Sequence, residues 1–163
     1  DILENEEKAI QSILRKLPDT NIKKNENGLV KIVYFDSLCN GNIPSELQSF
    51  KDLEALIVDG TELSKLPEWV SKLPINEIYL PNNQLNQFPN HLLKMKKLEG
   101  IHLGDNPISS IDFVLDFPQL KWLWMPGTKI SKFPIIKQVP NSPAIDFHLA
   151  ETLIDSIPDE ISS

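Results

Sequence analysis

An internal repeat of 22 to 24 residues constrains this chain more than any other feature of its sequence. The segments that begin at Leu53 and Ile75 have apolar residues at the same offsets, and each ends in an apolar residue followed by proline. The same frame recurs along the chain, with repeats starting near residues 29, 53, 75, 98, 120 and 144. A period of this length is typical of chains built from stacked units, none of which can bury its apolar side alone.

Within each repeat, apolar residues alternate with residues of another kind, as in a strand with one buried face. The fourth and sixth positions are predicted to point inward; they are Ile32/Tyr34, Leu56/Val58, Ile78/Leu80, Ile101/Leu103, Leu123/Met125 and Phe147/Leu149. One strand per repeat, followed by a return, predicts six parallel strands about 4.8 Å apart. The ninth position is always Ser, Thr or Asn, which suits a side chain that bonds backbone groups inside a sharp turn. Only Asn83 and Asn106 are asparagines there, so the other copies should make fewer hydrogen bonds.

The return segments have their own pattern. Five of the six contain an apolar residue followed by proline, and the fourth has Ile111-Asp112 instead. Apolar pairs at helix-like spacing follow, which predicts short helical or 3-10 turns that pack on the sheet. These pairs are Leu47/Phe50, Val70/Leu73, Leu92/Met95 and Val114/Phe117. Trp69 is predicted to pack in such a turn, and Cys39 is predicted to lie in an inward apolar column.

The pattern resembles the leucine-rich repeat, L-x-x-L-x-L-x-x-N-x-L, with a repeat length near that of bacterial and plant-receptor members. Six copies cover residues 29–163. The resemblance implies an α/β fold, a right-handed solenoid with a parallel sheet on its concave face and short turns and loops on its convex face. It also implies binding of other macromolecules at the concave face, and it favours a secreted or cell-surface protein.

The two ends differ from the repeats. Residues 2–17 predict an amphipathic helix ended by Pro18, whose apolar face comprises Leu3, Ile10, Ile13, Leu14 and Leu17. Residues 21–24 and 29–32 flank Asn27-Gly28, which is typical of a hairpin turn. Residues 1–28 are therefore interpreted as an N-terminal cap that forms a single domain with the repeats. No comparable cap follows the last strand, which leaves self-association through that end as one possibility.

Composition excludes several classes of function. The 163 residues include 16 basic and 23 acidic side chains, a net charge of −7, which argues against a nucleic-acid partner or an anionic membrane. No apolar stretch reaches the roughly 20 residues of a membrane span, so no membrane insertion is expected. A single cysteine excludes a disulfide framework. No catalytic, cofactor-binding or metal-binding motif is present, so we expect no enzyme, no cofactor and no metal site.

The residues predicted to face away from the core become strongly aromatic in the C-terminal half. The third position reads Lys31, Ala55, Glu77, Gly100, Trp122 and Asp146, and the fifth reads Val33, Ile57, Tyr79, His102, Trp124 and His148. Because strands stack side by side, each set forms a row. Tyrosine and tryptophan are enriched at binding hot spots, and Gly100 is predicted to leave a notch beside Trp122. The candidate partner-binding residues are Tyr79, His102, Trp122, Trp124 and His148, together with the carboxylates Glu77, Asp105 and Asp146.

Other interpretations of these residues remain open. The aromatics could stabilise one another across strands, and His102, Asp146 and His148 could bind a metal. The favoured function is non-enzymatic recognition of another protein. The alternatives are a carbohydrate-binding face, because aromatic platforms beside carboxylates suit sugars, and the substrate-recognition half of a larger effector enzyme.

Overall fold

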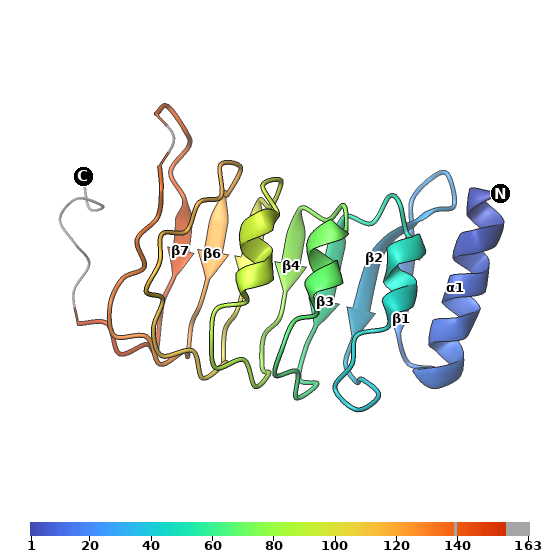
Figure 1. Ribbon diagram of the computed structural model, residues 1–163, viewed down its shortest axis with the longest axis horizontal. Helices are drawn as coiled ribbons and strands as arrows, with labels where there is room; N and C mark the ends of the chain where they lie inside the picture. Colours follow the sequence, from blue (N-terminus) through green and yellow to red (C-terminus); the bar gives the residue numbers. More distant parts are fainter. Residues whose placement is uncertain (139, 156–163) are drawn as a thin grey trace.

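The computed structural model describes residues 1–138 and 140–155, which form an α/β arrangement around one sheet of seven strands. Strand order in the sheet follows the chain from β1 to β7, so sequence neighbours are also spatial neighbours. Figure 1 shows the strands in a row, with α1 (Ile2–Lys16) beside the N-terminal end. The strands are β1 (Asn21–Lys24), β2 (Val30–Phe35), β3 (Ala55–Val58), β4 (Glu77–Tyr79), β5 (Gly100–His102), β6 (Trp122–Trp124) and β7 (Asp146–His148).

The six strands β2 to β7 are parallel, as the repeat predicts, and only β1 pairs antiparallel with its neighbour. Equivalent repeat positions lie opposite one another: Leu56 pairs with Ile78, Ile78 with Ile101, and Ile101 with Leu123. These residues are completely buried, and the column that they form is the core of the molecule.

The predicted register of the first repeat is wrong by one residue. Val33 pairs with Leu56, and Val33 and Phe35 are buried, whereas Ile32 and Tyr34 lie on the opposite side of β2. The run from Ile32 to Phe35 is apolar at every position, so alternation alone does not identify its inward side. A slip of one residue exchanges the two faces of a strand, and the first repeat therefore starts at Val30.

Three return segments form the predicted 3-10 turns. They are η1 (Ser45–Ser49), η2 (Glu68–Lys72) and η3 (Asn90–Lys94), and each follows a proline that occupies its N-cap position. Leu47, Val70 and Leu92 bury the inner side of these turns in the core, and the turns therefore cover one face of the sheet. Trp69 is partly buried against the same core, as predicted.

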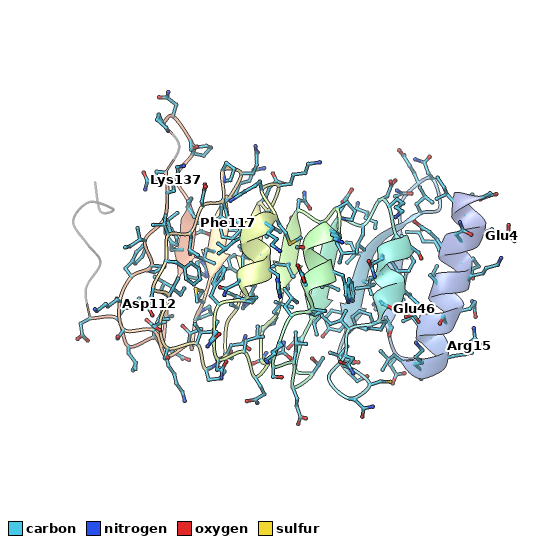
Figure 2. The ribbon with its side chains drawn as sticks, viewed as in Figure 1. Glu4, Arg15, Glu46, Asp112, Phe117 and Lys137 are labelled. Carbon is cyan, nitrogen blue, oxygen red and sulfur yellow. The ribbon has the colours of Figure 1, made fainter. Side chains whose placement is uncertain are left out.

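The fourth apolar pair, Val114/Phe117, does not lie in a helical turn. The segment lacks the preceding proline and instead pairs in parallel with the next return, through the Leu115–Ile136 bridge. The backbone N–H of Leu115 donates to the carbonyl of Ile135 at 2.8 Å. Figure 2 labels Asp112, Phe117 and Lys137 in this part of the molecule, where the returns are extended. Phe117 is buried, but Val114 remains about half exposed at 48%.

The turns after the strands are held by the ninth repeat position. The Nδ2 atom of Asn83 donates to the carbonyls of Val58, Leu80 and Pro81, and its Oδ1 accepts from Thr61 and Leu63. Thr128 instead donates a single bond to the carbonyl of Met125 at 2.9 Å. The asparagine side chains make more hydrogen bonds than Thr128, as the sequence predicts, and they also bond the neighbouring repeat. Among the described residues, the Thr128 hydroxyl bonds only within its own turn.

At the N-terminal end, α1 packs Ala9, Ile10 and Ile13 against the core. Leu3, which is predicted to lie on the apolar face, is 50% exposed. The buried carboxylate of Glu6 takes part in the packing instead, because its Oε2 accepts from the backbone N–H of Val30 at 2.7 Å. On the other side, Ser12 donates to Glu46 of η1, which Figure 2 labels next to α1.

Cys39 is exposed, so its predicted place in an inward column is wrong. The one-residue shift of the first repeat explains this, because Cys39 now lies in the loop after β2. Its backbone pairs there with that of Asn42 in an isolated antiparallel β-bridge. Residues 156–163 lie outside the described residues, as does Val139. The proline of the sixth repeat and the predicted self-association through the C-terminal end therefore lie outside the described part of the chain.

Candidate functional site

The sheet has one face that the 3-10 turns do not cover, and we call it the open face. Side chains alternate along a strand, so the residues on either side of each inward residue point to this face. Two rows result from the register. The first row contains Ile32, Ala55, Glu77, Gly100, Trp122 and Asp146, and the second contains Tyr34, Ile57, Tyr79, His102, Trp124 and His148.

The five aromatic candidate residues form one continuous group on this face, which we call the aromatic cluster: Tyr79, His102, Trp122, Trp124 and His148. The ring centroids of Trp122 and Trp124 are 4.7 Å apart, and those of Tyr79 and Trp122 are 5.2 Å apart. Trp124 stacks on His148 at 4.7 Å with an interplanar angle of 18°, and His102 meets Trp124 edge-on at 5.7 Å. Residues from four strands, β4 to β7, thus meet because the strands are in register.

The predicted notch at Gly100 is absent, because the indole of Trp122 fills it. A Cβ atom built on Gly100 would overlap Cε2 and Cζ2 of Trp122. Gly100 is buried although its position is on the open face. The absence of a side chain at Gly100 therefore lets the Trp122 ring lie over β5, where it contacts Tyr79 of β4.

Tyr79 and Glu77 act as a pair at the N-terminal side of the cluster. The Tyr79 hydroxyl donates to Oε2 of Glu77 at 2.5 Å. Partial burial, this hydrogen bond and the charge of Glu77 together raise the pKa of Tyr79 to about 12. Tyr79 therefore remains a neutral hydrogen-bond donor at physiological pH, and it fixes the carboxylate of Glu77 beside the aromatic rings.

His102 is held in its neutral form. Its Nδ1 accepts a hydrogen bond from the backbone N–H of Gly104 at 3.0 Å. Burial lowers the pKa of His102 below its ordinary value of 6.5, and this effect exceeds the opposing influence of the Asp105 and Asp59 carboxylates. His102 therefore gains a proton only at a pH below the usual range of an imidazole. His148 is more exposed, with Nε2 3.7 Å from Oδ2 of Asp146.

The remaining candidate residues, Asp105 and Asp146, are exposed beside the cluster. Asp146 lies opposite Trp122 in the first row. Asp105 has a positive φ of 54° in the turn after β5, at the position taken by Gly60, Asn82 and Gly127 in other repeats. A left-handed backbone favours Gly, Asn and Asp, so the turn geometry itself explains an aspartate there.

Sequence reasoning missed Tyr34 and Asp59. Tyr34 belongs to the second row but was assigned to the interior by the register error, and Asp59 follows β3 at the same edge as Asp105. Burial and the Asp59 and Asp36 carboxylates raise the pKa of Tyr34. The hairpin between β1 and β2 was the signal that could have corrected the register, because it places Ile22 opposite Val33.

The indole nitrogen of Trp124 is buried, and it has no hydrogen-bond partner among the described residues. Within residues 1–138 and 140–155, no group of three or more His, Cys, Asp or Glu side chains could hold a metal ion. No helix in that part of the chain has the length and apolar character needed to cross a membrane.

Comparisons with known proteins leave the family open. No protein-family model matches the chain. A search of curated proteins also returned no match. Among solved structures, a chain in the crystal structure of the BIR3–SERK2 complex from Arabidopsis thaliana is similar, with a TM-score of 0.48 and 17% sequence identity. The likeness covers 81% of this chain and 80% of that chain, and at this score it identifies neither a partner nor an activity.

Proposed function

We propose that this chain is a leucine-rich repeat solenoid whose open face is the concave face, and that this face recognises another protein without catalysing a reaction. The observation that supports the proposal best is the continuous aromatic cluster on the open face. The uniform parallel register from β2 to β7 supports the solenoid, because crossovers between parallel strands are almost always right-handed.

The cluster is unnecessary for filling the core. Ile78, Ile101 and Leu123 already occupy the inner side of the same strands and are completely buried. The aromatic rings lie on the other side, where each of them keeps some exposure. Contacts between the rings stabilise the sheet by cross-strand pairing, worth about 0.2–1 kcal/mol per pair, but this does not require tryptophan at two positions of one strand.

The contacts within the cluster also prepare it for binding. Trp122 rests on Gly100 and contacts Tyr79 and Trp124, so its orientation is fixed before a partner arrives. Rigid aromatic side chains lose little conformational entropy on binding, which is why Tyr and Trp dominate binding hot spots.

One observation favours carbohydrate as a second candidate ligand. The Trp124 and His148 rings are nearly parallel, with an interplanar angle of 18°. Oδ2 of Asp146 lies beside them, 3.7 Å from Nε2 of His148. A flat aromatic surface beside a carboxylate would also accept the apolar face of a sugar ring and bond its hydroxyls. A glycan array is therefore the second arm of the test.

The test is a selection of displayed peptides on the wild-type chain, without counter-selection against any variant. Enriched peptides are then measured by calorimetry against wild type, Trp124→Ala and Tyr34→Ala. Tyr34 is the matched control, because it is an aromatic residue in the same row but outside the cluster. We expect Trp124→Ala to weaken binding about thirty-fold, as for a hot-spot tryptophan, with little change for Tyr34→Ala.

Equal losses in the two variants would mean that the cluster is not the binding site. Binding of glycans but of no peptide would replace the protein partner by a carbohydrate at the same face.

A further inference from the structure

The charged groups around the aromatic cluster are predominantly acidic. The carboxylate of Glu77 raises the pKa of Tyr79, and the carboxylates of Asp105 and Asp59 oppose the lowering of the His102 pKa by burial. Among the described residues, the only other titratable group that shifts either pKa is the imidazole of His148, which lowers that of His102. These carboxylates come from different repeats, so they border the cluster along the direction in which the strands stack.

Carboxylates also flank the Trp122 ring within its own row. The row runs Glu77, Gly100, Trp122 and Asp146 on successive strands. Because the indole of Trp122 extends over Gly100, it bridges the space between a carboxylate on β4 and another on β7. The hydrogen bond from Tyr79 occupies Oε2 of Glu77 and does not involve Oε1 of the same carboxylate.

Two lysines near the N-terminal ends of the strands, Lys31 and Lys121, already form ion pairs with glutamates. Lys121 and Glu99 occupy equivalent positions just before β6 and β5. Nζ of Lys121 lies 2.6 Å from Oε1 of Glu99. Nζ of Lys31 lies 4.0 Å from Oε2 of Glu54. These lysines therefore add little positive charge to the open face, and a partner meets aromatic rings surrounded by an excess of carboxylates.

We propose that the partner recognised by the open face presents a basic segment, with an arginine side chain stacked on the Trp122 and Trp124 rings. This inference rests on the proposed function and adds the chemistry of the partner. The face of an indole ring attracts a cation, most often a guanidinium, and neighbouring carboxylates can accept its N–H groups. Arginine fits better than lysine because its planar group stacks on a ring and still donates hydrogen bonds at its edge.

Charge complementarity favours this occupant over a neutral or acidic one. The chain as a whole has a net charge of −7, so long-range attraction acts in the same direction as the local carboxylates. An acidic segment on the same rings would place like charges next to Glu77, Asp105 and Asp146, which opposes association.

The experiment uses the full chain with Trp69→Phe, so that Trp122 and Trp124 are its only tryptophans. Two end-blocked peptides are compared by tryptophan fluorescence: one of alternating glycine and arginine, and the same peptide with citrulline, the neutral isostere, in place of arginine. We expect the arginine peptide to bind at least about ten-fold more tightly than the citrulline peptide. We also expect its affinity to fall between about 20 mM and about 150 mM salt, because ionic screening weakens exposed charge pairs.

Two charge variants distinguish local from overall electrostatics. Asp105→Asn with Asp146→Asn removes two carboxylates beside the cluster, and Asp19→Asn with Asp112→Asn removes two exposed carboxylates elsewhere. Asp112 lies on the return between β5 and β6, as labelled in Figure 2. We expect the first pair to weaken the arginine peptide about three-fold or more and the second to leave it nearly unchanged.

Equal binding of the arginine and citrulline peptides, binding of neither, or equal losses in the two charge variants would overturn the basic-partner inference. None of these results would affect the proposed function, which depends on the loss of selected peptides in Trp124→Ala. If selected peptides bind at the cluster but contain no basic residues, the site stands and the inferred chemistry fails.

Discussion

The two faces of the sheet are built from the same short strands but differ in chemistry. In β6, Leu123 is completely buried, while Trp122 and Trp124 on either side of it lie on the open face. The inward column stays apolar through the repeats, whereas the second outward row carries an aliphatic residue, Ile57, in β3 and aromatic rings in every strand from β4 to β7. The difference teaches that packing limits one face to apolar residues and leaves the other free to form a specific site.

The largest effect is expected from exchanging a buried residue for a polar one. Ile101→Asn puts an amide into a completely buried apolar site, and we expect a loss of about 3–5 kcal/mol in the free energy of unfolding. The adjacent His102→Asn changes the open face and should cost less than about 1 kcal/mol. Thermal and denaturant unfolding followed by circular dichroism measure both, and similar losses would contradict the division into two faces.

The next effect compares two turns on the buried side. Among the described residues, the Asn83 side chain takes part in six hydrogen bonds and that of Thr128 in one. Asn83→Ala leaves several buried backbone groups without partners and should cost about 3 kcal/mol, against about 1 kcal/mol for Thr128→Ala. If denaturant unfolding gives equal values, the hydrogen bonds between repeats do not contribute as the structure indicates.

Much of the fold could be predicted from the sequence, because the repeat restates the same pattern in successive copies. The parallel strands, the helix at residues 2–16 and three of four 3-10 turns follow from spacing alone. The inward side of β2 could not be assigned from alternation, because residues 32–35 are all apolar; the hairpin pairing of β2 with β1 identifies it. The extended return near Leu115 also could not, because it depends on pairing with Ile136 in the next repeat.

A smaller effect is expected at the contact between Gly100 and Trp122 on the open face. Gly100→Ala adds a methyl group where the Trp122 ring lies, so the ring must turn away. We expect a loss of about 1 kcal/mol in stability and a shift of the tryptophan emission as Trp122 leaves Tyr79. Unfolding curves and emission spectra test this, and an unchanged spectrum would show that Trp122 does not rest on Gly100.

The smallest effect is a dependence of stability on pH. Because the pKa of His102 is lowered on folding, the unfolded chain binds a proton more readily below about pH 6.5. The neutral His102 should therefore make wild type lose stability as the pH falls from about 7.5 to about 5, by more than the His102→Asn variant loses. Melting temperatures of both proteins at the two pH values measure the difference, and equal losses would exclude His102 as the cause.

The grouping of the candidate residues could be predicted better than the geometry of their contacts. Stacking of strands in register brings the third and fifth positions of successive repeats together whatever the side chains are, so the grouping of aromatics followed from the repeat. The orientation of Trp122 over Gly100 and the bond from Tyr79 to Glu77 depend on the local packing of rings and carboxylates. The prediction of a notch beside Gly100 was wrong for this reason, because the neighbouring Trp122 ring fills the space that the glycine leaves.

The central claim is that the aromatic cluster serves binding and contributes only modestly to stability. The most direct measurement is the unfolding free energy of Trp124→Ala together with its affinity for a peptide selected on the wild-type chain. The account predicts a stability loss of at most about 2 kcal/mol, from the ring contacts of Trp124 with three neighbours, and an affinity loss of about thirty-fold. A variant that unfolds readily, or one that binds the selected peptide as tightly as wild type, would contradict it.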